Sequence, residues 1–145
     1  MTTEIICPAG NGRAYSYAMA YNNSFIRDLH HVQLAMPAGG EDLARDFYAG
    51  VLGLTEVPKP EALRGRGGVW FETGAVRLHL GVEQPFSPAR KAHPALRVSS
   101  LEEAKTALWA QGLEFRSEID LPGISRIYVD DPFGNRIELL ELLEG

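Results

Sequence analysis

The chain has 145 residues, the length of one domain, and is long enough to bury a substantial core. Its composition, with 45% hydrophobic and 23% charged residues, is that of an ordinary folded protein. A formal net charge of −5 argues against binding to nucleic acid, and no apolar run approaches the roughly 20 residues that cross a bilayer. We therefore expect a soluble protein with neither a nucleic-acid nor a membrane partner.

Residues 1–27 show neither a helical nor a strand period, and we interpret them as an extension outside the core. Turn residues punctuate this segment at 10–12 and 22–24. The segment is either disordered or an arm that packs on a neighbouring subunit. It lacks the charged start and apolar middle of a signal peptide, and the single cysteine, Cys7, has no partner for an intrachain disulfide. Both features favour a cytoplasmic protein.

The first regular patterns lie between residues 31 and 80. Residues 31–36 alternate as a half-buried strand does, and residues 41–49 place apolar side chains at helical spacing. Two further strands are predicted over 69–72 and 75–80, joined by Thr73 and Gly74. The apolar positions of the first strand are Val32, Leu34 and Met36, and those of the helix are Leu43, Phe47 and, less cleanly, Ala44 and Tyr48.

A second set of patterns follows a proline-containing linker over residues 81–92. Residues 93–98 alternate as a strand, and Ser100 with Glu103 forms a capping box at the start of a helix that ends near Gly112. Its apolar stripe is Leu101, Ala104 and Leu108. Strands are predicted over 124–129 and 135–142. Pro132 and Gly134 between them suit a tight turn, which indicates a hairpin.

The two sets form an internal repeat. His31 of the first set corresponds to His93 of the second, and His79 corresponds to Glu138 at nearly the same offset. Each set is a strand, a helix and two or three strands, so the fold class is α+β. Two such units can bury their helix faces locally and curl the opposite faces into a shared cavity. We expect one domain over residues 28–145, with repeats at 28–80 and 93–143.

Strand alternation places four potential metal ligands on the cavity side. The apolar residues of each strand should face the helix, which leaves His31, His79, His93 and Glu138 on the other side. Three imidazoles and one carboxylate suit a divalent ion such as zinc, nickel, iron or manganese. His30 has the opposite phase and no partner in the repeat, so we interpret it as a surface histidine.

Cationic side chains lie in or beside the cavity-facing strands of this acidic protein, and they could attract a carboxylate or phosphate group of a substrate. Arg77 is the strongest candidate because it shares a face with His79, two residues away. Arg97 is the second candidate and lies in the strand that follows His93. We predict both arginines to bind the substrate.

Several motifs resemble the vicinal oxygen chelate superfamily, which includes glyoxalase I, extradiol dioxygenases, methylmalonyl-CoA epimerase, and fosfomycin and bleomycin resistance proteins. The resemblance covers about residues 29–143. Its carriers are Leu-His-His-Val-Gln-Leu from Leu29, Phe47-Tyr48 followed by Leu52-Gly53-Leu54, Leu78-His79-Leu80, His93-Pro-Ala-Leu-Arg-Val98, and Asp131-Pro-Phe-Gly-Asn-Arg-Ile-Glu-Leu139.

The resemblance implies paired βαβββ repeats that form a curved mixed sheet around a metal-binding cavity, with the helices outside. His31, His93 and Glu138 match positions that supply two histidines and a carboxylate in many members. His79 stands where glyoxalases usually have a glutamate and the epimerases a glutamine, which argues against a strict glutathione-dependent glyoxalase. The resemblance also implies a homodimer. The metal site then lies either within one chain or between the two chains.

The function implied by the resemblance is that of a divalent-metal-dependent, glyoxalase-like enzyme of the lyase or isomerase type. The metal would bind two neighbouring oxygens of a small, anionic substrate, and Glu138 would act as the catalytic base. One alternative is an iron-dependent extradiol-type dioxygenase. Another is a metal-free protein that sequesters a drug, as bleomycin resistance proteins do.

Overall fold

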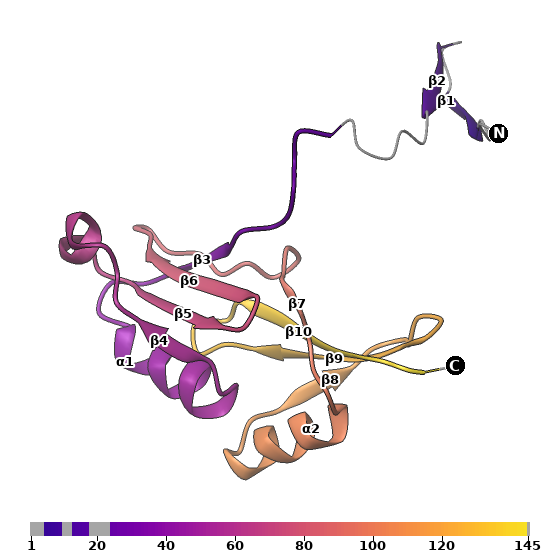
Figure 1. Cartoon of the computed structure of the whole chain (residues 1–145). Helices are drawn as coiled ribbons and strands as arrows, with labels where there is room; N and C mark the ends of the chain where they lie inside the picture. Colours follow the sequence, from indigo (N-terminus) through magenta and orange to yellow (C-terminus); the bar gives the residue numbers. More distant parts are fainter. Residues whose placement is uncertain (1–4, 10–12, 18–23, 145) are drawn as a thin grey trace.

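The structure is a computed structural model that describes residues 5–9, 13–17 and 24–144 (Figure 1). Strands β1 (Ile5–Ala9) and β2 (Arg13–Tyr17) pair as an antiparallel two-stranded sheet. The sequence pattern does not predict these strands. The predicted turn at residues 10–12 and most of the one at residues 22–24 lie outside the described residues. The prediction that the extension is either disordered or an arm on a neighbouring subunit is therefore not tested.

The first half of the domain contains four strands and one main helix. They are β3 (Val32–Met36), α1 (Glu41–Ala44) with its π-helical continuation η1 (Arg45–Val51), β4 (Thr55–Val57), the 3₁₀ segment η2 (Glu61–Arg66), β5 (Val69–Thr73) and β6 (Val76–Val82). β3 runs parallel to β6, and the other neighbours are antiparallel, in the order β3-β6-β5-β4.

The second half repeats this arrangement. It consists of β7 (Ala95–Arg97), α2 (Leu101–Ala110), β8 (Phe115–Ser117), β9 (Ile124–Asp130) and β10 (Arg136–Leu142). The sheet order is β7-β10-β9-β8, again with a parallel first pair. Each half is therefore a strand, a helix and three strands. This confirms the predicted paired βαβββ architecture, which is built here from two four-stranded mixed sheets.

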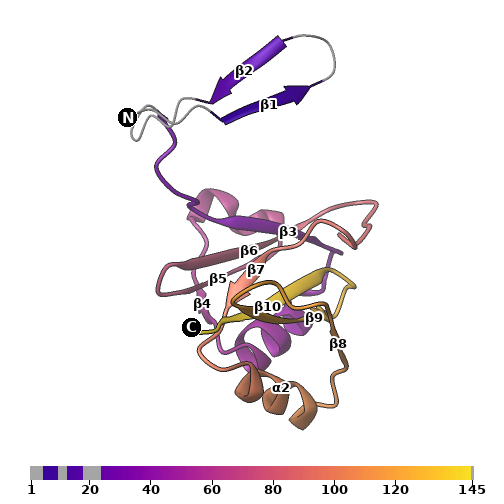
Figure 2. The same ribbon diagram turned by 90° about the vertical axis from the view of Figure 1, so that its right-hand side faces the viewer.

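The apolar faces of the two sheets and both helices share one core. Both helices lie on the same side of the molecule in Figures 1 and 2. The buried side chains from both halves form a single cluster, whose members include Met36, Phe71 and Leu78 of the first half and Leu108 and Ile137 of the second. The opposite face of each sheet carries the polar side chains.

A buried hydrogen bond links the two halves. Tyr48 donates its hydroxyl proton to Asp131 Oδ2 over 2.7 Å, and burial raises the pKa of Tyr48 well above its usual value. The same carboxylate accepts hydrogen bonds from the backbone of Phe133 and from both the backbone and the side chain of Asn135. Asn135 in turn donates to the carbonyl of Ala35 in β3. The β9–β10 turn therefore anchors the second half to the first.

The structure confirms several local predictions. Ser100 Oγ accepts a hydrogen bond from the Glu103 backbone at the start of α2. Gly134 has a φ of 92°, the left-handed conformation that the predicted turn requires. Leu101 and Leu108 are buried along the predicted stripe of α2.

Other predictions were wrong in detail. Leu43, placed in the apolar stripe of the first helix, is 55% exposed. It lies in the single turn of α1, whereas the buried Phe47 and Tyr48 lie in η1. Strands β4 and β8 are only three residues long, too short for an alternation to be recognised. β6 extends to Val82, two residues beyond the predicted end of the first repeat. Among the described residues, no helix has the length and apolarity that a membrane crossing requires.

We expect Tyr48→Phe to lower the free energy of unfolding by about 1–3 kcal/mol, because it removes one donor from a buried carboxylate and leaves the packing of the ring intact. Chemical denaturation followed by circular dichroism measures the change. Glu102→Gln is the control, because it breaks an exposed ion pair with Lys105 and should change stability by less than about 0.5 kcal/mol. Equal effects of the two substitutions would contradict a link between the halves at Tyr48.

Candidate metal centre

The first half brings two of the predicted ligands into contact. His31 directly precedes β3, and His79 lies on β6 at a position paired with Trp70 of β5. The His79 ring stacks on Trp70 with a centroid separation of 3.9 Å and on His31 with a separation of 4.6 Å. His79 is only 4% exposed. The first half thus holds a pair of imidazoles on its polar face.

His79 has the properties of a neutral metal ligand. Its Nε2 is buried and has no hydrogen-bond partner among the described residues. Burial lowers the pKa of His79, and the nearby His31 lowers it further. A neutral imidazole is the form that binds a metal ion, so the unpaired nitrogen fits a ligand role.

The second half brings the other two predicted ligands together. His93 lies two residues before β7, and Glu138 lies on β10 opposite Ala95. The Glu138 backbone N–H donates to the carbonyl of Pro94 over 3.0 Å, which fixes the strand beside the histidine. His93 Nε2 then lies 2.9 Å from Glu138 Oε2, and Glu138 is 6% exposed.

The hydrogen bonds around His93 require a proton or a metal ion between His93 Nε2 and Glu138 Oε2. His93 Nδ1 lies 2.8 Å from the carbonyl oxygen of Lys91, which can only accept, so Nδ1 carries a proton. Nε2 and Glu138 Oε2 would otherwise direct lone pairs at each other over 2.9 Å. Either a proton or a metal ion resolves this contact. A histidine whose Nδ1 donates to a backbone carbonyl is also the usual arrangement of a metal-bound imidazole.

The two pairs belong to different sheets. His31 and His79 lie on the sheet of the first half, and His93 and Glu138 lie on the sheet of the second. In the part of the chain that the structure describes, no three histidine, cysteine, aspartate or glutamate side chains are arranged to hold one metal ion. One copy of the chain therefore presents two separate pairs of side chains, and the four predicted ligands do not meet.

Three residues beside Glu138 were not assigned a role from the sequence. Arg126 donates to Glu138 Oε1 over 3.3 Å and to the Tyr128 hydroxyl over 3.1 Å. The Arg136 guanidinium carbon lies 4.9 Å from the centroid of the Tyr128 ring. The strand alternation places Arg136 on the same face as Glu138, which is the signal that could have identified it. Arg126 and Tyr128 lie on β9, and their proximity to Glu138 follows from the register between β9 and β10, which the sequence does not specify.

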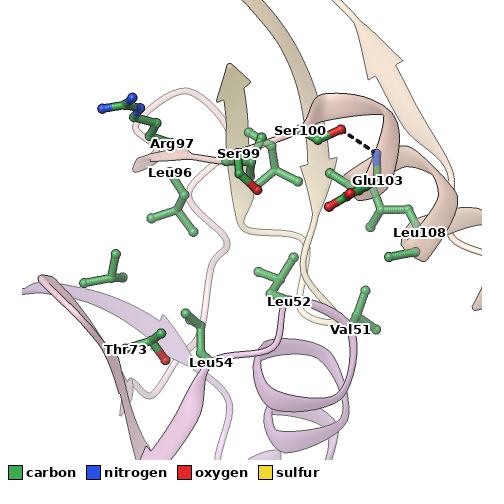
Figure 3. A pocket seen from close by; sticks show the side chains of 15 residues that line it. Val51, Leu52, Leu54, Thr73, Leu96, Arg97, Ser99, Ser100, Glu103 and Leu108 are labelled. Carbon is green, nitrogen blue, oxygen red and sulfur yellow. Dashed lines mark hydrogen bonds between the residues drawn. The ribbon is translucent and has the colours of Figure 1, made fainter. Parts of the chain in front are cut away.

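The predicted substrate-binding arginines occupy different surroundings. Arg77 lines a cavity of about 200 Å³ together with His30 and His31, and its Nε lies 3.9 Å from Glu72 Oε2. Arg97 lines a separate cavity of about 340 Å³ between the two halves. Figure 3 shows that this second cavity is surrounded mainly by aliphatic side chains, and that the Arg97 side chain points away from it. Only Arg77 therefore lies beside a predicted ligand.

His30 is exposed, as the sequence predicts, but it is not remote from the pair formed by His31 and His79. Its Nδ1 lies 3.0 Å from His31 Nδ1, and the two rings meet edge to face. One of these two nitrogens must donate the proton of this hydrogen bond. His30 therefore orients the His31 ring.

Comparison with known proteins identifies the family. The family model described as the Glyoxalase/Bleomycin resistance protein/Dioxygenase superfamily matches residues 28–139. The chain belongs to this superfamily. Among curated proteins, none matches the chain.

Solved structures of this superfamily resemble the chain over most of its length. A glyoxalase family protein from Bacillus anthracis is 48% identical, with a TM-score of 0.79, over 82% of this chain and 98% of that one. A lactoylglutathione lyase from Agrobacterium tumefaciens is 23% identical, with a TM-score of 0.64, over 81% and 96% of the two chains. The fosfomycin resistance protein FosX from Listeria monocytogenes is 17% identical, with a TM-score of 0.65, over 80% and 93%. The last two show likeness of fold alone.

We expect Arg126→Met to lower the free energy of unfolding more than Arg116→Met does, because Glu138 is buried and would lose a charged partner. Arg116→Met on the same sheet is the matched control, since Arg116 and Asp130 are both about half exposed. This control should cost less than about 1 kcal/mol. Urea unfolding of both metal-free variants measures the difference, and a larger loss for Arg116→Met would contradict the burial argument.

Proposed function

We propose that the protein is a divalent-metal-dependent enzyme of the lyase or isomerase type, which acts on a small oxygenated, anionic substrate. In this proposal His31, His79, His93 and Glu138 hold one ion, such as zinc, nickel, iron or manganese. The observation that carries it is the 2.9 Å approach of His93 Nε2 to Glu138 Oε2, with His93 Nδ1 already bonded to a carbonyl. The buried, unpaired Nε2 of His79 supports the same donor set.

The residues of the site have separable roles. A bound divalent ion would supply Lewis acidity toward two neighbouring oxygens of the substrate. Glu138 is the group suited to accept a proton, because it is the one carboxylate among the four side chains. Arg126 holds one of its oxygens and thereby orients the group. Trp70 covers one side of His79 and limits the access of water to that imidazole.

The proposal requires two copies of the chain. Each half carries two ligands on the polar face of its own sheet, and the apolar faces are occupied by the shared core. A twofold dimer that apposes the first half of one copy to the second half of the other would bring four ligands together twice. We therefore propose a homodimer with two metal sites, each shared between the protomers.

The metal content of the purified protein tests the proposed ligands. Protein purified without chelators should contain about one equivalent of a divalent metal per chain, and His31→Ala or Glu138→Ala should lose it because each removes a ligand. His30→Ala should retain the metal, since His30 contacts His31 and not the ion. Inductively coupled plasma mass spectrometry measures all four proteins.

Two results would contradict the proposed function. Wild-type protein without metal that still binds bleomycin would instead support a drug-sequestering protein. Oxygen uptake with catechol after anaerobic loading with iron, and no activity with nickel or zinc, would support a ring-cleaving dioxygenase.

A mixed dimer tests whether the site is shared. One chain carries His31→Ala with His79→Ala, the other carries His93→Ala with Glu138→Ala, and the two have different affinity tags. Neither variant alone should bind metal in stoichiometric amount. The purified mixed dimer should contain about one ion, because one of its two sites receives all four native ligands. A mixed dimer without metal would contradict a shared site.

A further inference from the structure

Arg136 is a half-buried cation beside Glu138 that forms no ion pair with a described residue. It lies two residues before Glu138 on β10, so both side chains project from the same face of the sheet. Its guanidinium stacks over the Tyr128 ring at 4.9 Å, and its Nε is buried with no hydrogen-bond partner among the described residues. A buried donor left unpaired is unfavourable, so it points to a ligand that supplies the acceptor.

Two neighbouring arginines of this face, on β8 and β9, already have partners. Arg116 forms two hydrogen bonds with Asp130, of 3.0 and 2.8 Å. Arg126 contacts Glu138, the Tyr128 hydroxyl and the carbonyl of Ile119. In the described part of the chain, Arg136 and the exposed Arg97 of β7 are the arginines of this face that form no ion pair. Of these two, Arg136 is the one that stacks on Tyr128, beside His93 and Glu138.

Tyr128 joins Arg136 to the pair formed by His93 and Glu138. Its ring meets the His93 ring edge to face at a centroid separation of 5.2 Å, while its face supports Arg136. The Tyr128 hydroxyl accepts a hydrogen bond from Arg126, which leaves its own proton free to be donated. Two donors, one charged and one neutral, thus lie next to His93 and Glu138.

We propose that Arg136 and Tyr128 form the subsite for the anionic group of the substrate. The group is a carboxylate or a phosphonate, which the planar guanidinium binds through paired N–H donors. Stacking on Tyr128 fixes the plane of the guanidinium before the substrate binds. This inference rests on the proposed function, because the metal site determines where the chelated oxygens of the substrate lie relative to the subsite.

The first experiment compares two chelators by calorimetry on zinc-loaded protein. Butyrohydroxamate and succinic monohydroxamate share the metal-binding group and differ by a terminal methyl against a carboxylate. The wild-type protein should bind the carboxylate compound about tenfold more tightly. Arg136→Gln should abolish this preference and leave zinc content and butyrohydroxamate affinity unchanged, and Tyr128→Phe should reduce it. Arg116→Gln is the control and should preserve it.

Equal affinities in the wild type, or a preference that survives in Arg136→Gln, would overturn the subsite. A second experiment on metal-free protein separates this failure from failure of the metal site. Methylphosphonate should shift the Nε–H resonance of Arg136 in ¹⁵N spectra, identified by its loss in Arg136→Lys, and should not shift that of Arg116. This shift in a protein that binds no metal would uphold the anion subsite and reject the proposed function. Absence of the shift would reject the subsite even if zinc binds.

Discussion

The short contact between His93 Nε2 and Glu138 Oε2 is the interaction on which the interpretation of this protein depends. It is imposed by the backbone, because the Glu138 N–H donates to Pro94 and the carbonyl of Lys91 accepts from His93 Nδ1. These bonds leave two electron-pair donors 2.9 Å apart in a mostly buried place. A proton or a metal ion must lie between them, and the pair of imidazoles on the other sheet, His31 and His79, offers two further ligands for a metal ion.

The division of the fold into two sheets explains why one chain presents two separate pairs of side chains. The apolar face of each sheet is committed to the shared core, and the Tyr48–Asp131 hydrogen bond links the two halves on that side. The ligands lie on the faces that the core leaves free. The edge strand β3 follows His31, and the edge strand β7 follows His93. The same packing that stabilises the monomer thus separates His31 and His79 from His93 and Glu138.

Strand periodicity and the internal repeat were enough to predict the fold and to place His79 and Glu138 on the polar faces of the two sheets. The alternation in residues 76–82 and 136–142 places His79 and Glu138 opposite the buried leucines and isoleucines, as the structure shows. The sequence could not show that the pairs lie apart, because periodicity specifies a face and not the packing of one sheet against another. It also missed Arg126 and Tyr128, whose contacts depend on the register between β9 and β10.

Anomalous X-ray diffraction from metal-loaded crystals, recorded at the absorption edge of the bound element, is the most direct test of the central claim. We expect one anomalous peak per chain, within about 2.0–2.2 Å of the imidazole nitrogens and the carboxylate oxygen. The ligands at each peak should be His31 and His79 of one protomer with His93 and Glu138 of the other. A peak away from these four side chains, or one bound by all four from the same protomer, would contradict it.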